Sequence, residues 1–339
     1  MTRLSTQWSA SLGLRVPIVA APMGGVAGGR FAHAVSRAGA LGMIGMGSAG
    51  SAAKLATQLA EFGAADAATD ASDASDEASA PPFGIGLVHW GLTRDPELLD
   101  TALAARPHLV SIGFAERFDW VERVHAVGAL AATQVYTPAE AVVAADAGVD
   151  VVVARGSEGG GHGDPRMGAL SLLDAVLDAI GGRATVLAAG GVSSGRSLAA
   201  VLAAGADGAW VGTALMASPE ALTPDSARPV LLAASGDDTV NTSAADAALG
   251  LPWPERFPER VVRNAFVEEW AARVDELRGS GDALDGFRAE FTAANSAGDH
   301  RLVPVDAGEG VGLLRSVRPV AEILDEFGRD AVALLRRWA

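Results

Sequence analysis

The sequence predicts an α/β protein built as a (β/α)8 barrel of the TIM type, and two patterns lead to this prediction. Eight short apolar runs alternate with alanine- and leucine-rich segments of helical period, so that each run is followed by a plausible helix. Pieces such as Ala-Gly-Ala and Ala-Gly-Val precede several of the runs and are typical of helices that end at a glycine. A doubly wound parallel sheet is the alternative, but no GxGxxG pattern follows the first run.

Aliphatic runs bounded by glycine or proline are typical of strands buried on both faces, as in a parallel barrel. In chain order, the predicted strands are Val16–Ala20, Leu41–Met46, Phe83–Val88, Leu109–Ile112, Leu130–Gln134, Val149–Ala154, Thr185–Ala189 and Gly208–Val211. The segments between them predict helices over Arg30–Ala38, Ser51–Phe62, Pro96–Ala105, Phe118–Val127, Pro138–Ala147, Leu170–Ile180 and Ser197–Ala204.

Two regions interrupt this alternation. Residues 64–82 are rich in Ala, Asp, Ser and Thr without apolar periodicity, which predicts a disordered surface loop. Residues 214–310 carry aromatic and aliphatic side chains at helical spacing, which predicts a helical cap or substrate domain over the barrel mouth. We expect Trp253, Phe266 and Trp270 to form the small core of this insertion, and residues 1–213 and 311–339 to form the barrel.

The composition bounds the classes of function. A formal charge of −15 over 339 residues opposes binding to nucleic acids and anionic membranes, which both need basic surfaces, so the expected partner is a small-molecule substrate. The absence of cysteine excludes disulfides, thiolate nucleophiles and iron–sulfur clusters. No apolar run is long enough for a membrane span or a signal peptide, so a cytoplasmic protein, monomeric or homodimeric, is expected.

Lys54 is the single lysine, and it falls in a predicted amphipathic helix that faces solvent. A lysine that forms a Schiff base on a barrel must lie in the pocket at a strand end. Schiff-base chemistry, including that of most pyridoxal phosphate enzymes, is therefore excluded.

The glycine-rich segment that follows the strand at Val149–Ala154 predicts an active site. It reads Arg155-Gly-Ser-Glu-Gly-Gly-Gly-His162-Gly-Asp164. Glycines let backbone N–H groups approach a ligand closely, and histidine is suited to moving protons near neutral pH. The alternative is a flexible turn with a solvated histidine.

Barrel enzymes bind their ligands at the carboxyl ends of the strands, with phosphate commonly held after strands 7 and 8. Ala189-Gly190-Gly191 follows the seventh predicted strand and Gly212-Thr213 follows the eighth. Together with the helix N-terminus that comes next, these glycines are expected to hold a phosphorylated cofactor without a lysine.

The other histidines carry weaker signals. His33, His108 and His125 are expected at the surface or at helix ends. His89 ends the third strand, Tyr136 follows the fifth and His300 lies before the last helices, so these three are candidate substrate contacts. No HxH or HExxH spacing occurs, and we expect no metal site.

Four segments resemble the FMN-dependent nitronate monooxygenases, formerly called 2-nitropropane dioxygenases, which share fold and motifs with the flavin-dependent enoyl reductases. They are APMGGVAGG after the first strand, GVDVVVARGSEGGGHG at the sixth, AAGGVSSGRSLAAVLAAGADGAWVGTAL across the last two, and VDAGEGVGLL. The resemblance implies a barrel that holds FMN non-covalently, with O2 as co-substrate.

The resemblance also implies roles for individual residues. The FMN phosphate would lie on Gly190, Gly191, Gly212 and Thr213, beside Ala189, and the flavin ring over Met23 and Gly24. Gln134 would donate to the pyrimidine edge, Gly160 and Gly161 would line the ring, and His162 would be the catalytic histidine. Arg155 would stabilise an anionic reduced flavin or bind an anionic substrate. The family usually has an uncharged amide or a carboxylate at Arg155 and an alanine at Gly159, so both positions depart from its pattern.

The implied reaction converts an alkyl nitronate, and as an option a neutral nitroalkane, to a carbonyl compound and nitrite. His162 would either bind the nitro oxygens or remove the α-proton of a nitroalkane. Two alternatives stay open, because the same motifs serve them: an NAD(P)H-dependent flavin reductase acting on an enoyl thioester or a quinone, and a non-catalytic flavin-binding protein.

Overall fold

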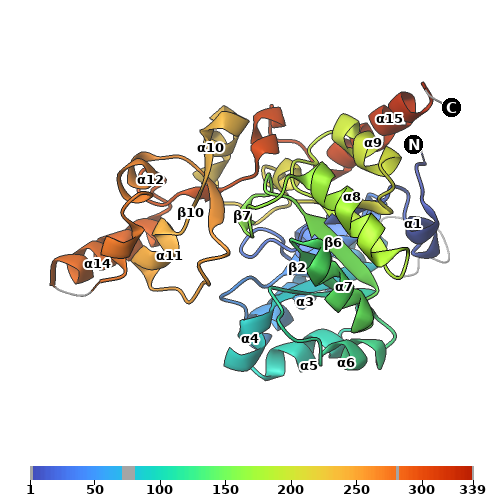
Figure 1. Ribbon diagram of the computed structural model, residues 1–339, viewed down its shortest axis with the longest axis horizontal. Coiled ribbons are helices and arrows are strands. Elements are labelled where there is room, and N and C mark those ends of the chain that lie inside the picture. Colours follow the sequence, from blue (N-terminus) through green and yellow to red (C-terminus); the bar gives the residue numbers. More distant parts are fainter. Residues whose placement is uncertain (1–2, 71–80, 280–281, 338–339) are drawn as a thin grey trace.

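The computed structural model describes residues 3–70, 81–279 and 282–337. At its centre, eight parallel strands follow the order β1-β9-β8-β6-β5-β4-β3-β2. Figure 1 labels β2 and β6 of this sheet, with helices packed around it. A parallel bridge between Val19 and Leu41 brings the two edge strands together, so the sheet forms a nearly closed barrel. The predicted α/β barrel is therefore confirmed.

The barrel strands lie where the apolar runs predicted them, with ends that differ by up to two residues. They are β1 Ile18–Ala20, β2 Gly42–Gly45, β3 Phe83–Val88, β4 Leu109–Gly113, β5 Leu130–Val135, β6 Val151–Arg155, β8 Thr185–Ala189 and β9 Gly208–Val211. The helices around them are α1 Gln7–Ser11, α2 Gly29–Arg37, α3 Ala52–Asp70, α4 His89–Arg94, α5 Glu97–Ala104, α6 Val121–His125, α7 Pro138–Asp146, α8 Ala169–Ile180, α9 Gly195–Ala203 and α15 Val320–Leu335. The short helices α1 and α4 were not predicted, because neither is long enough to show a helical period.

Alternate residues of the strands face opposite sides of the barrel wall. Val19, Val153 and Leu187 belong to the cluster inside the barrel, whereas Ile18 and Val152 belong to the larger cluster between strands and helices. Trp8 of α1 joins the inner cluster and is buried. The inside of the barrel is therefore a packed core, which leaves the mouth at the carboxyl ends of the strands for a ligand.

The prediction of a disordered loop over residues 64–82 is wrong for its first part. Residues 64–70 continue α3, which ends at Asp70. This part is held by tertiary contacts, since Asp66 pairs with the ring of His33 on α2 at 3.3 Å. Residues 71–80 lie outside the described residues.

The insertion contains a small antiparallel sheet that its helical periodicity did not predict. In order it comprises η1 Thr213–Leu215, α10 Ala227–Ala233, η2 Gly236–Asp238, β10 Thr239–Thr242, α11 Ala244–Leu249, β11 Glu259–Val262, α12 Ala265–Trp270, α13 Val274–Leu277, α14 Asp282–Ala297, β12 Val305–Asp306 and η3 Glu309–Leu313. Strand β11 pairs with β10, with β12 and with β7, which is Gly161–His162 of the glycine-rich segment. Figure 1 shows the insertion beside the barrel, with β7 between them.

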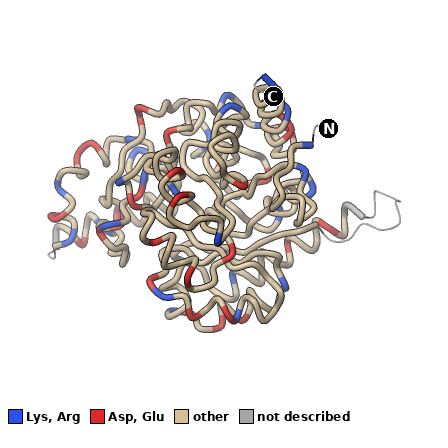
Figure 2. The backbone as a smooth tube through the Cα atoms, turned by 45° about the vertical axis from the view of Figure 1, so that its right-hand side comes forward, with Lys and Arg blue, Asp and Glu red and all other residues tan. Residues whose placement is uncertain are grey.

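Acidic and basic residues are interspersed over the barrel helices and the insertion (Figure 2). Many of them form ion pairs on the surface, such as Arg318 with Glu326 and Arg273 with Glu276. Among the described residues, no helix is long and apolar enough to cross a membrane.

Candidate active site

A cavity of about 810 Å³ opens at the carboxyl ends of the barrel strands. This volume lies within the range of about 300–1,000 Å³ that is usual for small-molecule sites. All the residues that the sequence assigned to catalysis and cofactor binding line this cavity: Met23, Gly24, Gln134, Arg155, Gly160, Gly161, His162, Ala189, Gly190, Gly191, Gly212 and Thr213.

The wall after β8 and β9 is made of glycine backbone. Gly190 and Gly191 have φ of +94° and +70°, a conformation that favours glycine. Among the described residues, the N–H groups of Gly190, Gly191 and Gly212 have no protein acceptor. Helix α9 begins shortly afterwards, with Ser194 as its N-cap. Free N–H groups next to a helix N-terminus form a site for an anion such as phosphate.

Arg155 lies in the cavity wall, but its hydrogen bonds go to the protein rather than toward a ligand. The guanidinium is buried, and its Nη2 donates to the carbonyl oxygens of Gly159, Gly160 and Gly161 at 2.9, 3.0 and 3.0 Å. Arg155 therefore anchors the glycine-rich loop from a position in the cavity wall, and its contact with an anionic flavin or substrate stays a prediction.

The glycines of this loop are needed for contacts within the protein as well as for ligand access. A Cβ on Gly163 would lie 1.9 Å from the guanidinium of Arg155, and one on Gly160 would lie 2.5 Å from the backbone nitrogen of Gly308. The loop is therefore pressed between Arg155 and the segment after β12, and larger side chains have no room.

His162 is held in place by the insertion. Its backbone is paired with Glu259 of β11, and its Nε2 lies 2.9 Å from Oδ2 of Asp246 on α11. The indole of Trp253 stacks on the imidazole, with ring centroids 3.4 Å apart and planes within 4°. These contacts fix the orientation of the ring, the carboxylate of Asp246 favours a proton on Nε2, and Nδ1 has no hydrogen-bond partner among the described residues.

Trp253 was expected in the core of the insertion, and this expectation is wrong. Phe266 and Trp270 do pack in that core, with Phe287 and Phe291. Trp253 lies instead in the long irregular segment between α11 and β11 and lines the cavity. Its aromatic partners are His162, Trp90 and Phe114.

Glu259 is a buried acid beside the His162–Asp246 pair. Burial, followed by repulsion from Asp306 and Asp246, raises the pKa of its carboxyl well above the ordinary value, and Oε1 has no hydrogen-bond partner. One ligand atom each from His162, Asp246 and Glu259 lies within 4.8 Å of the others, a donor set that also suits a divalent metal ion. Within this group Nε2 of His162 is hydrogen-bonded to Asp246, and Glu259 lies beside the pair as a buried acid.

Comparison with known proteins places this site in a family. The family model for nitronate monooxygenase matches residues 5–330. The chain belongs to the nitronate monooxygenase family. It is an oxidoreductase, as the motifs indicated. The chain is 33% identical to a nitronate monooxygenase of Pseudomonas aeruginosa over 72% of its own length and 69% of that protein.

This nitronate monooxygenase family member is also similar to two proteins that carry other enzyme names. It is 30% identical, over 88% of its length and 74% of the relative, to a (3aS,4S,5R,7aS)-5-hydroxy-7a-methyl-1-oxo-octahydro-1H-indene-4-carboxyl-CoA dehydrogenase of Mycobacterium tuberculosis. The solved structure of a nitroalkane oxidase from Streptomyces ansochromogenes superimposes with a TM-score of 0.78 at 26% identity, covering 98% of this chain and 100% of that one.

Three predicted substrate contacts of this nitronate monooxygenase family member lie outside the cavity. His89 begins α4 and is not among the lining residues, and His300 hydrogen-bonds Ser226 and the carbonyl of Val303. Tyr136 is buried in the wall of a neighbouring cavity, where its hydroxyl donates to Oε1 of Gln134 at 3.3 Å. That bond leaves the amide nitrogen of Gln134 free to face the main cavity.

His33 also differs from its expected place, because it is buried rather than at the surface. Asp246, Glu259 and Phe114 were missed altogether. Asp246 lies in the sequence SAADAAL, where nothing distinguishes it from a surface carboxylate on a helix. Phe114 follows β4, and its position at a strand end was the one signal available.

Glu259 supports a prediction about stability. In the unfolded chain the Glu259 carboxyl ionises near its ordinary pKa of 4.5, whereas in the folded chain it keeps its proton to higher pH. The contribution of Glu259 to the free energy of unfolding is therefore fully present below pH 4.5. It is lost as the pH rises through the pKa of Glu259 in the folded state. We expect Glu259→Gln to remove this loss and to raise Tm at pH 8 by roughly 1–2 °C, which corresponds to about 1 kcal/mol in a protein of this size.

The measurement is thermal unfolding at pH 5 and pH 8 for the wild type, for Glu259→Gln and for the exposed control Glu97→Gln. The control is expected to follow the wild type at both pH values. Equal Tm differences in all three proteins would show that Glu259 is ionised in the folded state.

Proposed function

We propose that the protein oxidises alkyl nitronates, using FMN and O2, to a carbonyl compound and nitrite. The observation that carries this proposal is the position of His162: Asp246 and Trp253 orient it at a cavity walled by the glycine backbone after β8 and β9. Membership of the nitronate monooxygenase family supplies the reaction class.

The cavity fits FMN in two respects. The free N–H groups of Gly190, Gly191 and Gly212 suit the phosphate, and the amide nitrogen of Gln134 suits the pyrimidine edge of the flavin. Met23 and Gly24 would lie against one face of the flavin ring. A Cβ on residue 24 would come within 2.7 Å of Gly47, so this position requires glycine. When bound there, FMN would supply the redox chemistry, taking electrons from the nitronate and passing them to O2.

The chain's own residues handle binding and protons. With Nε2 of His162 bonded to Asp246, Nδ1 has two uses. In the protonated ring it donates a hydrogen bond to a nitronate oxygen, and in the neutral ring its lone pair removes the α-proton of a nitroalkane. Trp253 covers one face of the imidazole and keeps water from that side.

The test is a visible absorption spectrum of the purified protein under anaerobic conditions, before and after adding an alkyl nitronate or NAD(P)H. Bleaching of flavin bands by the nitronate and not by the nicotinamide is expected. Protein that is isolated without flavin and cannot be reconstituted with FMN would overturn the proposal.

One observation favours a second candidate. A relative that matches over 88% of this chain is named as a carboxyl-CoA dehydrogenase, so the same barrel serves another redox reaction. Under this alternative the protein would be an NAD(P)H-dependent flavin reductase, and the nicotinamide alone would bleach the flavin in the experiment above.

Asp246 supports a prediction about activity. Asp246→Asn removes the carboxylate that fixes the ring and its proton, so we expect kcat/KM with a neutral nitroalkane to fall about 10–100-fold, as for other residues that orient a reactive group. The flavin content is expected to stay unchanged, because Asp246 does not line the cavity.

The matched control is Asp150→Asn, which alters a second His–Asp pair, His125 with Asp150 at 2.8 Å, on the surface. The measurement is kcat/KM across pH 6–9 for both variants. If kcat/KM fell by the same factor and with the same pH dependence in the Asp150→Asn control, the effect of Asp246→Asn would not come from the orientation of His162.

A further inference from the structure

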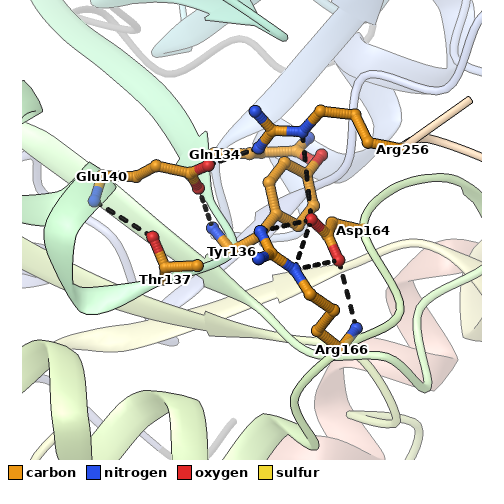
Figure 3. A network of polar contacts seen from close by, with 7 residues as sticks. All are labelled: Gln134, Tyr136, Thr137, Glu140, Asp164, Arg166 and Arg256. Carbon is orange, nitrogen blue, oxygen red and sulfur yellow. Dashed lines mark hydrogen bonds and ion pairs between the residues drawn. The ribbon is translucent and has the colours of Figure 1, made fainter. Parts of the chain in front are cut away.

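A second cavity of about 260 Å³ lies directly beside the main one. Phe114 and Gln134 line both cavities, so the two cavities adjoin at these side chains. Its remaining walls come from the segments after β4 and β5, from the first turns of α7 and from Phe257. Figure 3 shows the polar contacts of Gln134 and Tyr136 at this place.

An aromatic surface runs from His162 to the side cavity. Trp253 stacks on His162 and meets Phe114 edge to face, with centroids 4.8 Å apart. Phe114 in turn meets Phe257 at 5.0 Å, and Phe257 meets Tyr136 at 5.4 Å. An apolar group attached to a substrate at His162 therefore finds continuous aromatic contact along this path.

Phe114 stands at the boundary in an unusual backbone conformation, with φ of +60°. A bulky side chain rarely adopts this conformation, and it persists only where the surroundings impose it. Here the ring is held among Trp90, Trp253 and Phe257. The ring is thereby fixed between the two cavities.

The charges around the side cavity disfavour an anionic occupant. Arg256 is paired with Glu140 and with Asp164 (Figure 3). Its guanidinium lies 4.4 Å from the ring centre of Phe257. Glu116 adds a further acid to the wall. A phosphate or a second carboxylate would meet two acids and a cation that is already paired.

The outer end of the side cavity is apolar and reaches the surface. Val143 on α7 is 56% exposed and Ala139 is exposed in the preceding turn. Both line the side cavity but not the main one. An apolar chain in the side cavity can cover these side chains and extend toward solvent.

We propose that the side cavity is a subsite for the uncharged apolar arm of the substrate whose nitronate group lies at His162. This inference rests on the proposed function for the identity of the head group. The structure assigns the arm to an alkyl or aryl chain, because most of the wall is aromatic and aliphatic and its two acids, Glu116 and Glu140, disfavour an anionic arm.

The test measures binding without turnover, so that it is independent of the reaction. Linear carboxylates share the planar, singly charged two-oxygen head of a nitronate but are not oxidised. Calorimetric titration of the flavin-loaded protein with carboxylates from propionate to octanoate gives Kd as a function of chain length. We expect Kd to fall by up to about fourfold for each methylene that enters the side cavity.

Two variants alter the side cavity from its outer end: Ala139→Leu fills it, and Val143→Asp places a charge on its wall. The control Ala104→Leu makes the same change on the exposed face of α5. In both variants octanoate is expected to bind at least fivefold more weakly, with propionate changed less than twofold, and the control is expected to match the wild type.

A Kd that does not depend on chain length in the wild type would overturn the subsite, as would an unchanged dependence in Ala139→Leu and Val143→Asp. If the subsite is present but no nitronate is oxidised, the proposed reaction fails and the subsite stands. Steady-state kcat/KM for nitronates of the same chain lengths then separates the two conclusions.

Discussion

Replacing His162 by Asn is expected to lower kcat/KM for a neutral nitroalkane by about 10²–10⁴-fold, the usual contribution of a general base. The asparagine side chain retains a donor toward Asp246, but it has no lone pair basic enough to take the α-proton. A nitronate formed before it meets the enzyme has already lost that proton. With this substrate only a hydrogen bond to a charged group is lost, which corresponds to about tenfold in rate.

The ratio of the two losses is the informative quantity, because both substrates pass through the same cavity. Flavin content, measured by absorbance, shows whether the cofactor site is intact in the variant. His125→Asn serves as the control, since His125 makes the same kind of pair with Asp150 but lies at the surface. Equal losses on nitroalkane and nitronate would mean that His162 binds the nitro group and does not act as a base.

Replacing Arg155 by Lys is expected to destabilise the protein by about 2–4 kcal/mol, because three partly buried carbonyl groups lose a charged donor. In the native structure one guanidinium nitrogen serves Gly159, Gly160 and Gly161 at once. The ammonium of lysine carries the same charge, but it has neither the flat fork of arginine nor its shape under Gly163. We expect the loop to loosen and the retained FMN to fall more than tenfold.

This substitution separates two roles for Arg155. If the residue acted through its charge on a flavin or an anionic substrate, lysine would preserve most of the function. The measurements are urea unfolding followed by circular dichroism, and FMN per protein after dialysis. Arg166→Lys is the control, because Arg166 is exposed and bonds only Asp164. Normal stability and normal FMN content in Arg155→Lys would show that Arg155 acts mainly through its positive charge on the flavin or on an anionic substrate.

The barrel was predictable because its signals are local. Each strand is a short aliphatic run with glycine or proline near its ends, as at Thr185–Ala189, and these runs need no knowledge of their partners. The rule that parallel strands present their carboxyl ends at one mouth then placed His162, Gly190 and Gly212 together. Their presence in one cavity follows from the fold, not from their spacing in the sequence.

The errors share a different cause. Strand β7 has only two residues, which is too short to show a periodic pattern, and it pairs with β11, which begins almost a hundred residues later. The sequence therefore did not predict β7. Trp253 was assigned to a core by its neighbours in sequence, whereas its neighbours in space are His162 and Phe114. His89 was expected to end the third strand at the mouth, but it begins helix α4 there and does not line the cavity.

The sequence by itself determined the barrel, the glycine backbone at the strand ends and the histidine among these glycines. Each of these features depends on residues that are neighbours in the chain. Only the tertiary structure decided what those residues contact. Asp246 reaches His162 across 84 positions, and Arg155 bonds the backbone of its own loop. Such contacts depend on how the insertion packs on the barrel mouth, and side-chain packing between distant segments leaves no periodic pattern in the chain.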